Sequence, residues 1–195
     1  MNSKTLDTRQ HILDVGYQLV AKKGFTGMGL AELLKNADVP KGSFYHYFQS
    51  KEQFGEALLE DYFTRYVEKL DALFYHSDGN FYQRIMRYWH YWAEHNSNQC
   101  DQGQCLVVKL AGEVTDLSEP MRLVFLKGTN KIIAMIADCI EQGIKSKDIN
   151  VKESVLIAER LYDLWIGACL MNKIRQDDSS LQLALQTTEQ WLNGN

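Results

Sequence analysis

The sequence contains only two prolines in 195 residues and few runs of β-branched residues, so little in it interrupts helices or favours strands. No stretch reaches the roughly 18 uninterrupted apolar residues that indicate a membrane-spanning helix. The N-terminus, MNSKTLDTRQ, lacks the apolar segment of a secretory signal peptide. We therefore expect a helical, soluble, cytoplasmic protein with no membrane partner.

Motifs of common enzyme and metal sites are also missing. The chain has no P-loop, glycine-rich dinucleotide turn, G-x-S-x-G or H-E-x-x-H sequence. Cys100, Cys105, His90 and His95 invite a metal-site interpretation, but the cysteines follow a C-x4-C spacing and the histidines, five residues apart, do not share a helical face. The sequence therefore predicts no catalytic residues, no metal and no cofactor.

Positive charge is scarce overall but concentrated at one end. The formal net charge is −4, yet residues 1–51 carry six lysines and one arginine against four acidic residues, a net +3, which leaves −7 for residues 52–195. A basic segment on an acidic chain is the expected electrostatic footprint of a nucleic-acid contact. The remaining acidic part would repel DNA and help to orient the basic face.

The segment Lys35–Lys51 predicts the end of one helix, a tight turn and the start of another. Val39 precedes Pro40, which disfavours a helical Val39 and suits an early position of the next helix for Pro40. The turn should therefore lie near Asp38 and Val39. Upstream, apolar residues at i, i+3, i+4 and i+7 between 30 and 37 complete a helix-turn-helix pattern.

The second of these helices has an apolar face and a polar face. Phe44 and Phe48 stand four residues apart and should anchor it to a core. The residues expected on the outer face are hydrogen-bond donors or close-approach positions, and they form the predicted DNA-binding set: Lys41, Gly42, Ser43, Tyr45, His46, Tyr47 and Lys51. Gly42 and Ser43 lie at the helix start, where base edges are nearest, and the others are suited to phosphates.

Apolar periodicity and capping signals predict about nine helices. Their expected ranges are 8–23, 30–37, 41–48, 50 to about 74, 81–95, 105–112, 119–143, 151–175 and 179–191. Gly24 should stop the first helix, and Ser50 with Gln53 has capping-box spacing at the start of the fourth. The predicted fold class is all-α, with a three-helix DNA-binding domain in residues 1–50 and an effector-sensing and dimerisation bundle in residues 51–195.

These motifs resemble the TetR family of one-component transcriptional repressors. The resemblance rests on Gly24-Phe25, the helix at 30–37 and VPKGSFYHYFQSKE at 39–52. The chain departs from the family pattern at Met28 and Gly29, where many members have two hydroxyl residues. Residues 103–122 and 164–168 also resemble an electrophile-responsive subgroup that represses N-ethylmaleimide reductase and glyoxalase genes. The resemblance implies a homodimer on a palindromic operator, joined through its last two long helices.

Cys105 is the predicted sensor. It lies at an expected helix N-terminus, where the dipole favours a reactive thiolate, and the resemblance places the subgroup's sensing cysteine at this position. The competing interpretation is a small buried hydrophobe. Lys173 corresponds to a subgroup lysine that would approach the thiol, unless it only extends to water. Cys100 is a weaker candidate for a resolving thiol, and Cys139 and Cys169 are expected in the core.

Aromatic residues of the bundle offer a second kind of effector site, a cavity for a small molecule, although such stripes are more often core. The residues of this set are Tyr62, Tyr66, Trp89, Trp92, Phe125 and Trp165. Three functions therefore compete: a repressor released by modification of Cys105, a repressor released by a reversible ligand in the bundle, and a helical enzyme or interaction module with a degenerate helix-turn-helix.

Overall fold

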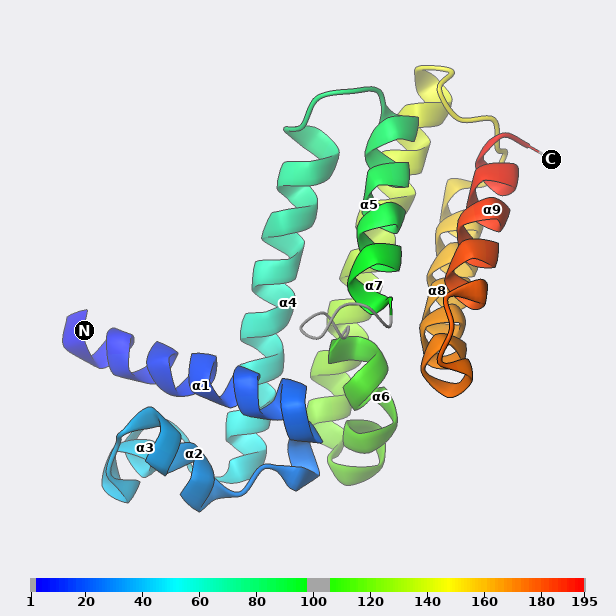
Figure 1. Cartoon of the computed structure of the whole chain (residues 1–195). Helices are drawn as coiled ribbons and strands as arrows, with labels where there is room; N and C mark the ends of the chain where they lie inside the picture. Colours follow the sequence, from blue (N-terminus) through cyan, green and yellow to red (C-terminus); the bar gives the residue numbers. More distant parts are fainter. Residues whose placement is uncertain (1–2, 98–105, 195) are drawn as a thin grey trace. The chain divides into compact units, whose positions relative to one another are not determined.

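The computed structural model describes residues 3–97 and 106–194, which form nine helices and no strand (Figure 1). The helices are α1 (Ser3–Gly27), α2 (Leu30–Ala37), α3 (Lys41–Tyr47), α4 (Lys51–Tyr75), α5 (Phe81–Asn96), α6 (Leu106–Leu117), α7 (Glu119–Lys145), α8 (Ser154–Arg175) and α9 (Ser179–Leu192). The predicted all-α class is confirmed.

Contacts divide the chain into two compact units. The first unit contains Met1–Arg65 and Lys109–Gly128, and the second contains Tyr66–Val108 and Thr129–Asn195. Parts of α6 and α7 thus belong to the same unit as the predicted DNA-binding helices. The boundary expected at residue 50 stays a prediction, because the units follow contacts and not a single point in the chain.

Gly24 interrupts α1, as its sequence predicted. Its backbone has φ 80° and ψ 171°, a conformation that residues with a side chain rarely adopt. One further helical turn follows before Met28, which is fully buried. The first helix therefore bends at Gly24 and its last turn runs on to Gly27, beyond the expected end at residue 23.

Close packing of α1 on α4 forms the core of the first unit. Ile12, Leu13 and Val20 of α1 are buried. At Gly16, an added Cβ would lie 2.3 Å from the Phe54 ring of α4, so the two backbones approach more closely than any side chain allows. Glycine at this position is explained by that approach.

Half of the predicted capping box at Ser50 is present. The Gln53 N–H donates to Ser50 Oγ at 3.0 Å, but the Gln53 side chain accepts from the Gln49 N–H at 2.6 Å. A complete box, which the sequence analysis did not predict, starts α5, where Asn80 and Gln83 cap each other. Both devices satisfy backbone N–H groups that the first turn of a helix leaves without partners.

The predicted end of the sixth helix at Gly112 is wrong. The helix continues to Leu117, and Gly112 is an exposed position inside it. Leu110 and Val114 on either side are fully buried, and this burial outweighs the cost of about 1 kcal/mol for glycine within a helix. The eighth helix starts at Ser154 and not at residue 151.

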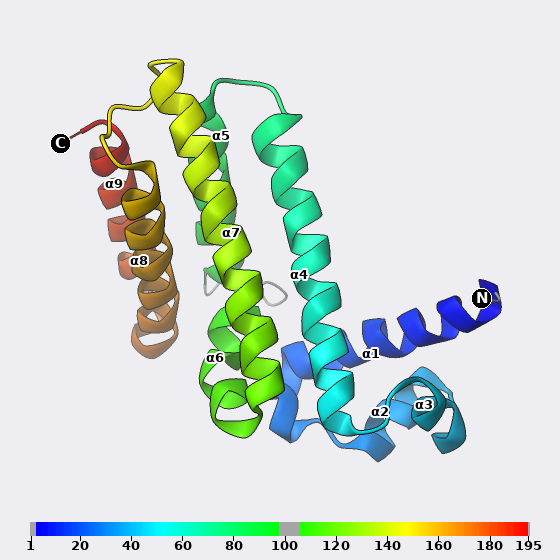
Figure 2. The ribbon, with the colours of Figure 1, turned by 180° about the vertical axis from the view of Figure 1, so that it is seen from behind.

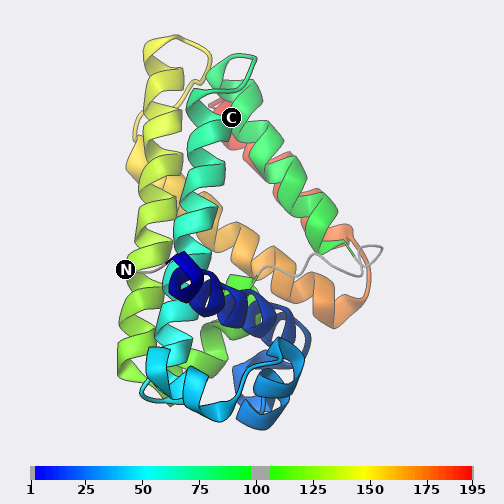
Figure 3. The same cartoon turned by 90° about the vertical axis from the view of Figure 1, so that its left-hand side faces the viewer.

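The second unit is built around tryptophan. Trp89 of α5 stacks on Trp165 of α8, with ring centroids 5.1 Å apart and planes 11° apart, and both rings are fully buried. Trp165 Nε1 donates to Thr188 Oγ1 of α9 at 3.0 Å. Helices α5 and α9 contact each other along their length, which Figure 3 shows for the green and red ribbons.

Within residues 3–97 and 106–194, no helix has the length and apolar character required to span a bilayer.

We predict opposite effects for alanine at two helical glycines of the first unit. Gly16→Ala should lower the free energy of unfolding by about 1–3 kcal/mol, because the methyl group meets the Phe54 ring. Gly112→Ala, which meets nothing within 4 Å, should raise it by about 0.5–1 kcal/mol. Urea unfolding followed by circular dichroism measures both, and equal effects of the two substitutions would contradict the packing described here.

Candidate nucleic-acid interface and effector site

The turn before α3 has the position that the sequence predicted. Asp38 ends α2 in the left-handed conformation, at φ 51° and ψ 45°, and its N–H bonds to the carbonyls of Leu34 and Lys35. Pro40 is the N-cap of α3, so it lies one position before the first helical residue, Lys41. The Pro40 carbonyl accepts a hydrogen bond from the Ser43 N–H at 2.9 Å. The turn therefore fixes the direction in which α3 leaves α2.

Two phenylalanines anchor α3, which confirms the predicted apolar face. Phe44 is 0% exposed and Phe48 is 1% exposed. Their ring centroids are 5.3 Å apart, and each lies within 6 Å of the Phe54 ring, at 5.7 Å and 5.2 Å. The helix is thus held to α4 from one side only.

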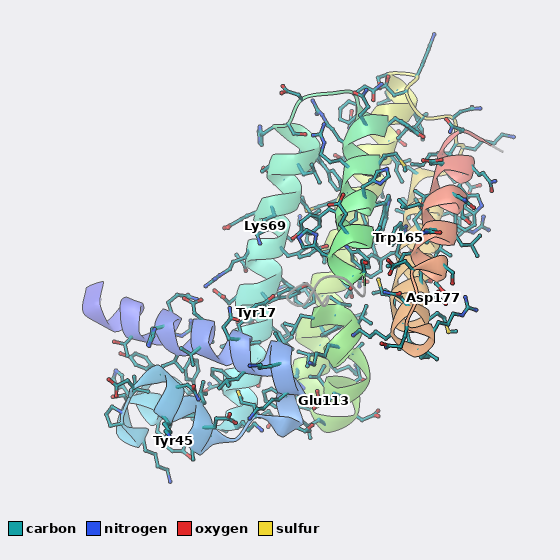
Figure 4. All side chains as sticks on the ribbon, in the orientation of Figure 1. Tyr17, Tyr45, Lys69, Glu113, Trp165 and Asp177 are labelled. Carbon is teal, nitrogen blue, oxygen red and sulfur yellow. The ribbon has the colours of Figure 1, made fainter. Side chains whose placement is uncertain are left out.

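The opposite side of α3 carries the predicted DNA-binding residues. Lys41, Gly42, Tyr45 and His46 are exposed, with Tyr45 at 46%, and Figure 4 labels Tyr45 on this helix. The Lys41 ammonium lies 5.8 Å from the centre of the Tyr45 ring. These groups present cationic and aromatic donors on an exposed face, which suits phosphate contacts.

Ser43 and Tyr47 are half-buried, between the exposed and the anchoring faces. The Tyr47 ring packs edge-on against His46, with centroids 4.8 Å apart. This packing restricts both rings, so their polar atoms lose little rotamer freedom when a partner binds.

Gly42 has no explanation within the subunit. A Cβ added there would meet nothing within 4 Å, and the backbone is not in a conformation that requires glycine. Alanine would stabilise the helix, so glycine costs free energy at this exposed position. The close approach of an external partner to the backbone supplies a reason for it.

Lys51 lies in a different environment from the other members of the set. Its ammonium sits 4.9 Å from the centre of the Phe25 ring and is half-buried. Burial lowers the pKa of Lys51, and the nearby Glu113 carboxylate opposes that shift. Lys51 therefore differs from Lys41, which is exposed.

The predicted sensor region is only partly described. Cys105 and Cys100 lie outside the described residues. Lys173 is half-buried in the last turn of α8. Cys139 and Cys169 are fully buried, as expected, and burial raises the pKa of the Cys139 thiol to about 12, which keeps that thiol protonated and unreactive.

The predicted aromatic set falls into two groups. Tyr62 and Phe125 both pack against Phe63 in the first unit, at centroid distances of 5.2 Å and 5.5 Å. The other four belong to the second unit and form a cluster, which we call the tryptophan cluster: Tyr66, Trp89, Trp92 and Trp165.

The tryptophan cluster combines dense ring packing with polar atoms. Trp92 Nε1 donates to Tyr66 Oη at 2.7 Å, and Tyr66 Oη is 3.0 Å from Tyr88 Oη. Trp89 Nε1 is buried and has no hydrogen-bond acceptor among the described residues. Tyr88 was missed in the sequence analysis, because nothing in its spacing distinguishes a hydrogen-bonding tyrosine from a packing one.

No group of three or more metal-ligating side chains occurs in the described parts of the chain. His90 and His95, considered above for a metal, lie on α5, where His95 Nδ1 is 2.9 Å from the Tyr91 carbonyl oxygen.

Comparison with known families gives two matches. Residues 12–58 match the model described as bacterial regulatory proteins of the TetR family, and residues 82–188 match a tetracyclin repressor-like C-terminal domain. The first match contains α2, α3 and the turn between them.

Individual relatives are similar over nearly the whole chain. The transcriptional repressor NemR of Escherichia coli (strain K12) is 45% identical over 184 residues, 92% of this chain and 90% of the relative. The repressor DhaR of Mycobacterium sp. (strain GP1) is 28% identical over 174 residues, 89% of this chain and 86% of the relative.

Solved structures agree with the sequence comparisons. The crystal structure of reduced E. coli NemR superimposes with a TM-score of 0.89 at 43% identity, covering 94% of this chain and 95% of that one. A TetR/AcrR family member of 40% identity gives a TM-score of 0.82 over 94% and 99% of the two chains. These similarities favour a DNA-binding regulator over a helical enzyme or interaction module.

We predict that Lys41→Gln weakens DNA binding by a similar factor for every variant of the operator sequence. Loss of one phosphate contact per recognition helix should reduce the slope of log affinity against log salt by about 0.9 for each contact. Fluorescence anisotropy between 50 and 200 mM salt, about the range over which such slopes are measured, gives this slope. The control is Lys69→Gln, an exposed lysine of α4 in the second unit (Figure 4), and an equal change of slope there would reject the assignment.

Proposed function

Because the chain belongs to the TetR family of bacterial regulatory proteins and is a transcriptional repressor, we propose that it binds a palindromic operator as a homodimer and that modification of Cys105 by an electrophile or oxidant releases it. The observation that carries the proposal is the recognition helix α3, with two buried phenylalanines on one side and a row of exposed donors on the other. The sequence of α3 agrees with the family signature, and the similarity to family members covers nearly the whole chain.

Direct DNA contacts are assigned to the exposed face of α3. Lys41, Tyr45 and His46 supply exposed donors, and Ser43 and Gly42 at the helix start come nearest to the base edges. Phosphate contacts fix position, while base contacts specify sequence. Tyr47 joins the phosphate contacts through its hydroxyl, and Lys51 is secondary because it packs on Phe25.

Dimerisation is supported by apolar side chains that remain exposed on the last two helices, which run side by side in Figures 1 and 2. Val155, Leu170 and Ile174 of α8 are 60%, 50% and 65% exposed, and Leu183 of α9 is 60% exposed. Leu181, also on α9, is buried within the subunit. A second copy of the chain would cover the exposed residues by two-fold symmetry.

The thiol trigger is supported by position in the sequence. Cys105 directly precedes Leu106, the first described residue of α6, and follows Gly103 and Gln104 as in the electrophile-responsive subgroup. The related NemR was crystallised in a form described as reduced. Cys139 and Cys169 are buried, so they compete poorly for reagents.

Lys173 is the cation that we assign to the thiol. A nearby ammonium would lower the pKa of Cys105 and raise its thiolate fraction at neutral pH. The last turn of α8 also favours a cation, because the helix dipole is negative there.

A reversible ligand is the second candidate effector, and one observation favours it. Trp89 Nε1 is a buried donor without an acceptor among the described residues, inside the tryptophan cluster. An unpaired buried donor costs about 1–3 kcal/mol, so a planar ligand with an acceptor atom would gain by meeting it.

We predict that Cys105→Ser retains operator binding but loses the response to N-ethylmaleimide. In the wild type, alkylation should reduce operator affinity by at least about tenfold, or about 1.4 kcal/mol. Gel shifts with the purified dimer measure affinity, and intact-protein mass spectrometry identifies the adduct.

The matched control is Cys100→Ser, which removes a thiol five positions earlier and should respond as the wild type does. Release of Cys105→Ser by the same reagent would reject the thiol trigger and favour the reversible ligand. A genomic footprint with and without electrophile identifies the operator needed for both measurements.

We predict that Leu170→Glu converts the dimer to a monomer, because two charged residues would meet across the two-fold axis. Operator affinity should fall by about a hundredfold or more, since each half-site is then bound independently. Sedimentation velocity measures the state of association. Tyr91→Glu, at an equally exposed aromatic residue of α5, should remain dimeric, and a Leu170→Glu protein that remains dimeric would exclude this face.

A further inference from the structure

Two side chains of α6 hold the bend in α1 from outside the DNA-binding helices. Lys109 Nζ donates to the carbonyl oxygens of Ala21 and Lys22, at 2.6 Å and 3.0 Å. These carbonyls end the first helical segment of α1, where the bend at Gly24 removes their intrahelical partners. A cation at this end also meets the negative pole of the helix dipole.

Glu113, one turn further along α6, binds the residues that follow the bend. Its carboxylate accepts from the backbone N–H groups of Phe25 at 3.0 Å and Thr26 at 2.7 Å, and also from the Thr26 hydroxyl. These N–H groups open the single turn that follows Gly24. Figure 4 labels Glu113 on α6. We call Lys109 and Glu113 the α6 clamp.

The side chains around the bend at Gly24 are closely packed. At Gly24 an added Cβ would lie 2.8 Å from Glu113 Oε2. Phe25 is 3% exposed and fills the space beside Gly55 of α4, where a Cβ would lie 2.7 Å from its ring. The clamp therefore fixes both the backbone of the bend and the ring that wedges it against α4.

The bend leads directly to the recognition helix. Met28 and Gly29 connect it to α2, whose Ala37 carbonyl lies 3.0 Å from His11 Nε2 of α1, and the turn at Asp38 joins α2 to α3. Only Met28 and Gly29 lie between α1 and α2, so the backbone direction at the bend sets where α2 begins.

Charge strengthens the clamp. Burial opposes ionisation of Glu113, but the hydrogen bonds from Thr26 and Phe25 and the charge of Lys109 together lower its pKa below the ordinary value. The carboxylate is therefore ionised at neutral pH, and hydrogen bonds to a charged acceptor are roughly twice as strong as neutral ones.

We propose that Lys109 and Glu113 are positioning residues for DNA binding: the α6 clamp holds the bend at Gly24 and so sets the orientation of α3 on the operator. This rests on the repressor function proposed above and adds residues that make no contact with DNA. The clamp lies on α6, whose first described residue, Leu106, directly follows Cys105 in the sequence. The clamp is therefore on the helix that is next to the proposed sensor cysteine in the chain.

The test compares four variants of the full-length dimer on the operator duplex recovered by footprinting. Lys109→Met and Glu113→Gln open one side of the clamp each, and Lys109→Arg keeps donors for the two carbonyls. The control is Glu119→Gln, an exposed carboxylate of α7 in the same unit that pairs with Arg122. All four proteins have to show the wild-type circular dichroism spectrum and dimer mass.

Operator affinity should fall by about tenfold or more for Lys109→Met, which loses both charge-assisted hydrogen bonds of Lys109, and for Glu113→Gln, which loses the charge of the acceptor. Lys109→Arg should restore most of it, and Glu119→Gln should be unchanged. Amide hydrogen exchange at Phe25 and Thr26 should accelerate by at least about tenfold in Glu113→Gln. It should not change in Glu119→Gln.

Folded Glu113→Gln protein with faster exchange at Phe25 and Thr26 but wild-type affinity would overturn the positioning role. Equal losses in Lys109→Met and Lys109→Arg would do the same, because the second keeps the hydrogen bonds. Failure of the wild-type protein to bind any duplex is a different result, since it rejects the repressor function and not the clamp.

Discussion

A helix of seven residues is not stable by itself in water, and the recognition helix α3 has that length. Its free energy of formation has to come from packing, which here means Phe44 and Phe48 against Phe54 of α4. Burial of one such ring contributes about 1.5–3 kcal/mol, whereas exposed donors on the other face contribute almost nothing to folding. The position of every exposed donor therefore depends on two rings that face away from DNA.

The same dependence extends to helices beyond the DNA-binding segment. Glu52 at the start of α4 accepts a hydrogen bond from Ser118, the residue before α7, and the side chains of Phe25 and Met121 both lie against Gly55. Residues 109–128 belong to the same compact unit as α1–α3 for this reason. The supports of α1–α3 therefore include residues far along the chain, in α6 and α7.

Local signals in the sequence were sufficient for the helix-turn-helix and the buried face of α3, because both lie on one short segment. Val39-Pro40 located the turn, and the spacing of Phe44 and Phe48 identified the buried face. Gly112 was misread as a helix end, since only the burial of Leu110 and Val114 shows that the helix continues. The α6 clamp was not predictable, because its partners lie 87 and 88 residues away.

Tertiary contacts decide which aromatic residues lie together. Six aromatic residues at helical spacing were considered either as a cavity lining or as core; Tyr62 and Phe125 pack on Phe63 in the first unit, and the tryptophan cluster lies in the second. Spacing shows which residues share a face of one helix, and it does not show which helices meet. The thiol interpretation of Cys105 used a motif instead, and so did not depend on those contacts.

Release from DNA requires only a small change in free energy. A modified thiol acts through the difference it makes between operator-bound and free conformations, and a tenfold loss of affinity corresponds to about 1.4 kcal/mol. One charge-assisted hydrogen bond contributes about 1.5–3 kcal/mol, so loss of one such bond to Glu113 in one subunit would be enough for a tenfold loss of affinity. A symmetric dimer has two such clamps. The operator contacts need not change at all. In the proposed mechanism Lys41 and Tyr45 would serve DNA binding alone, while α6 would carry the response to the effector.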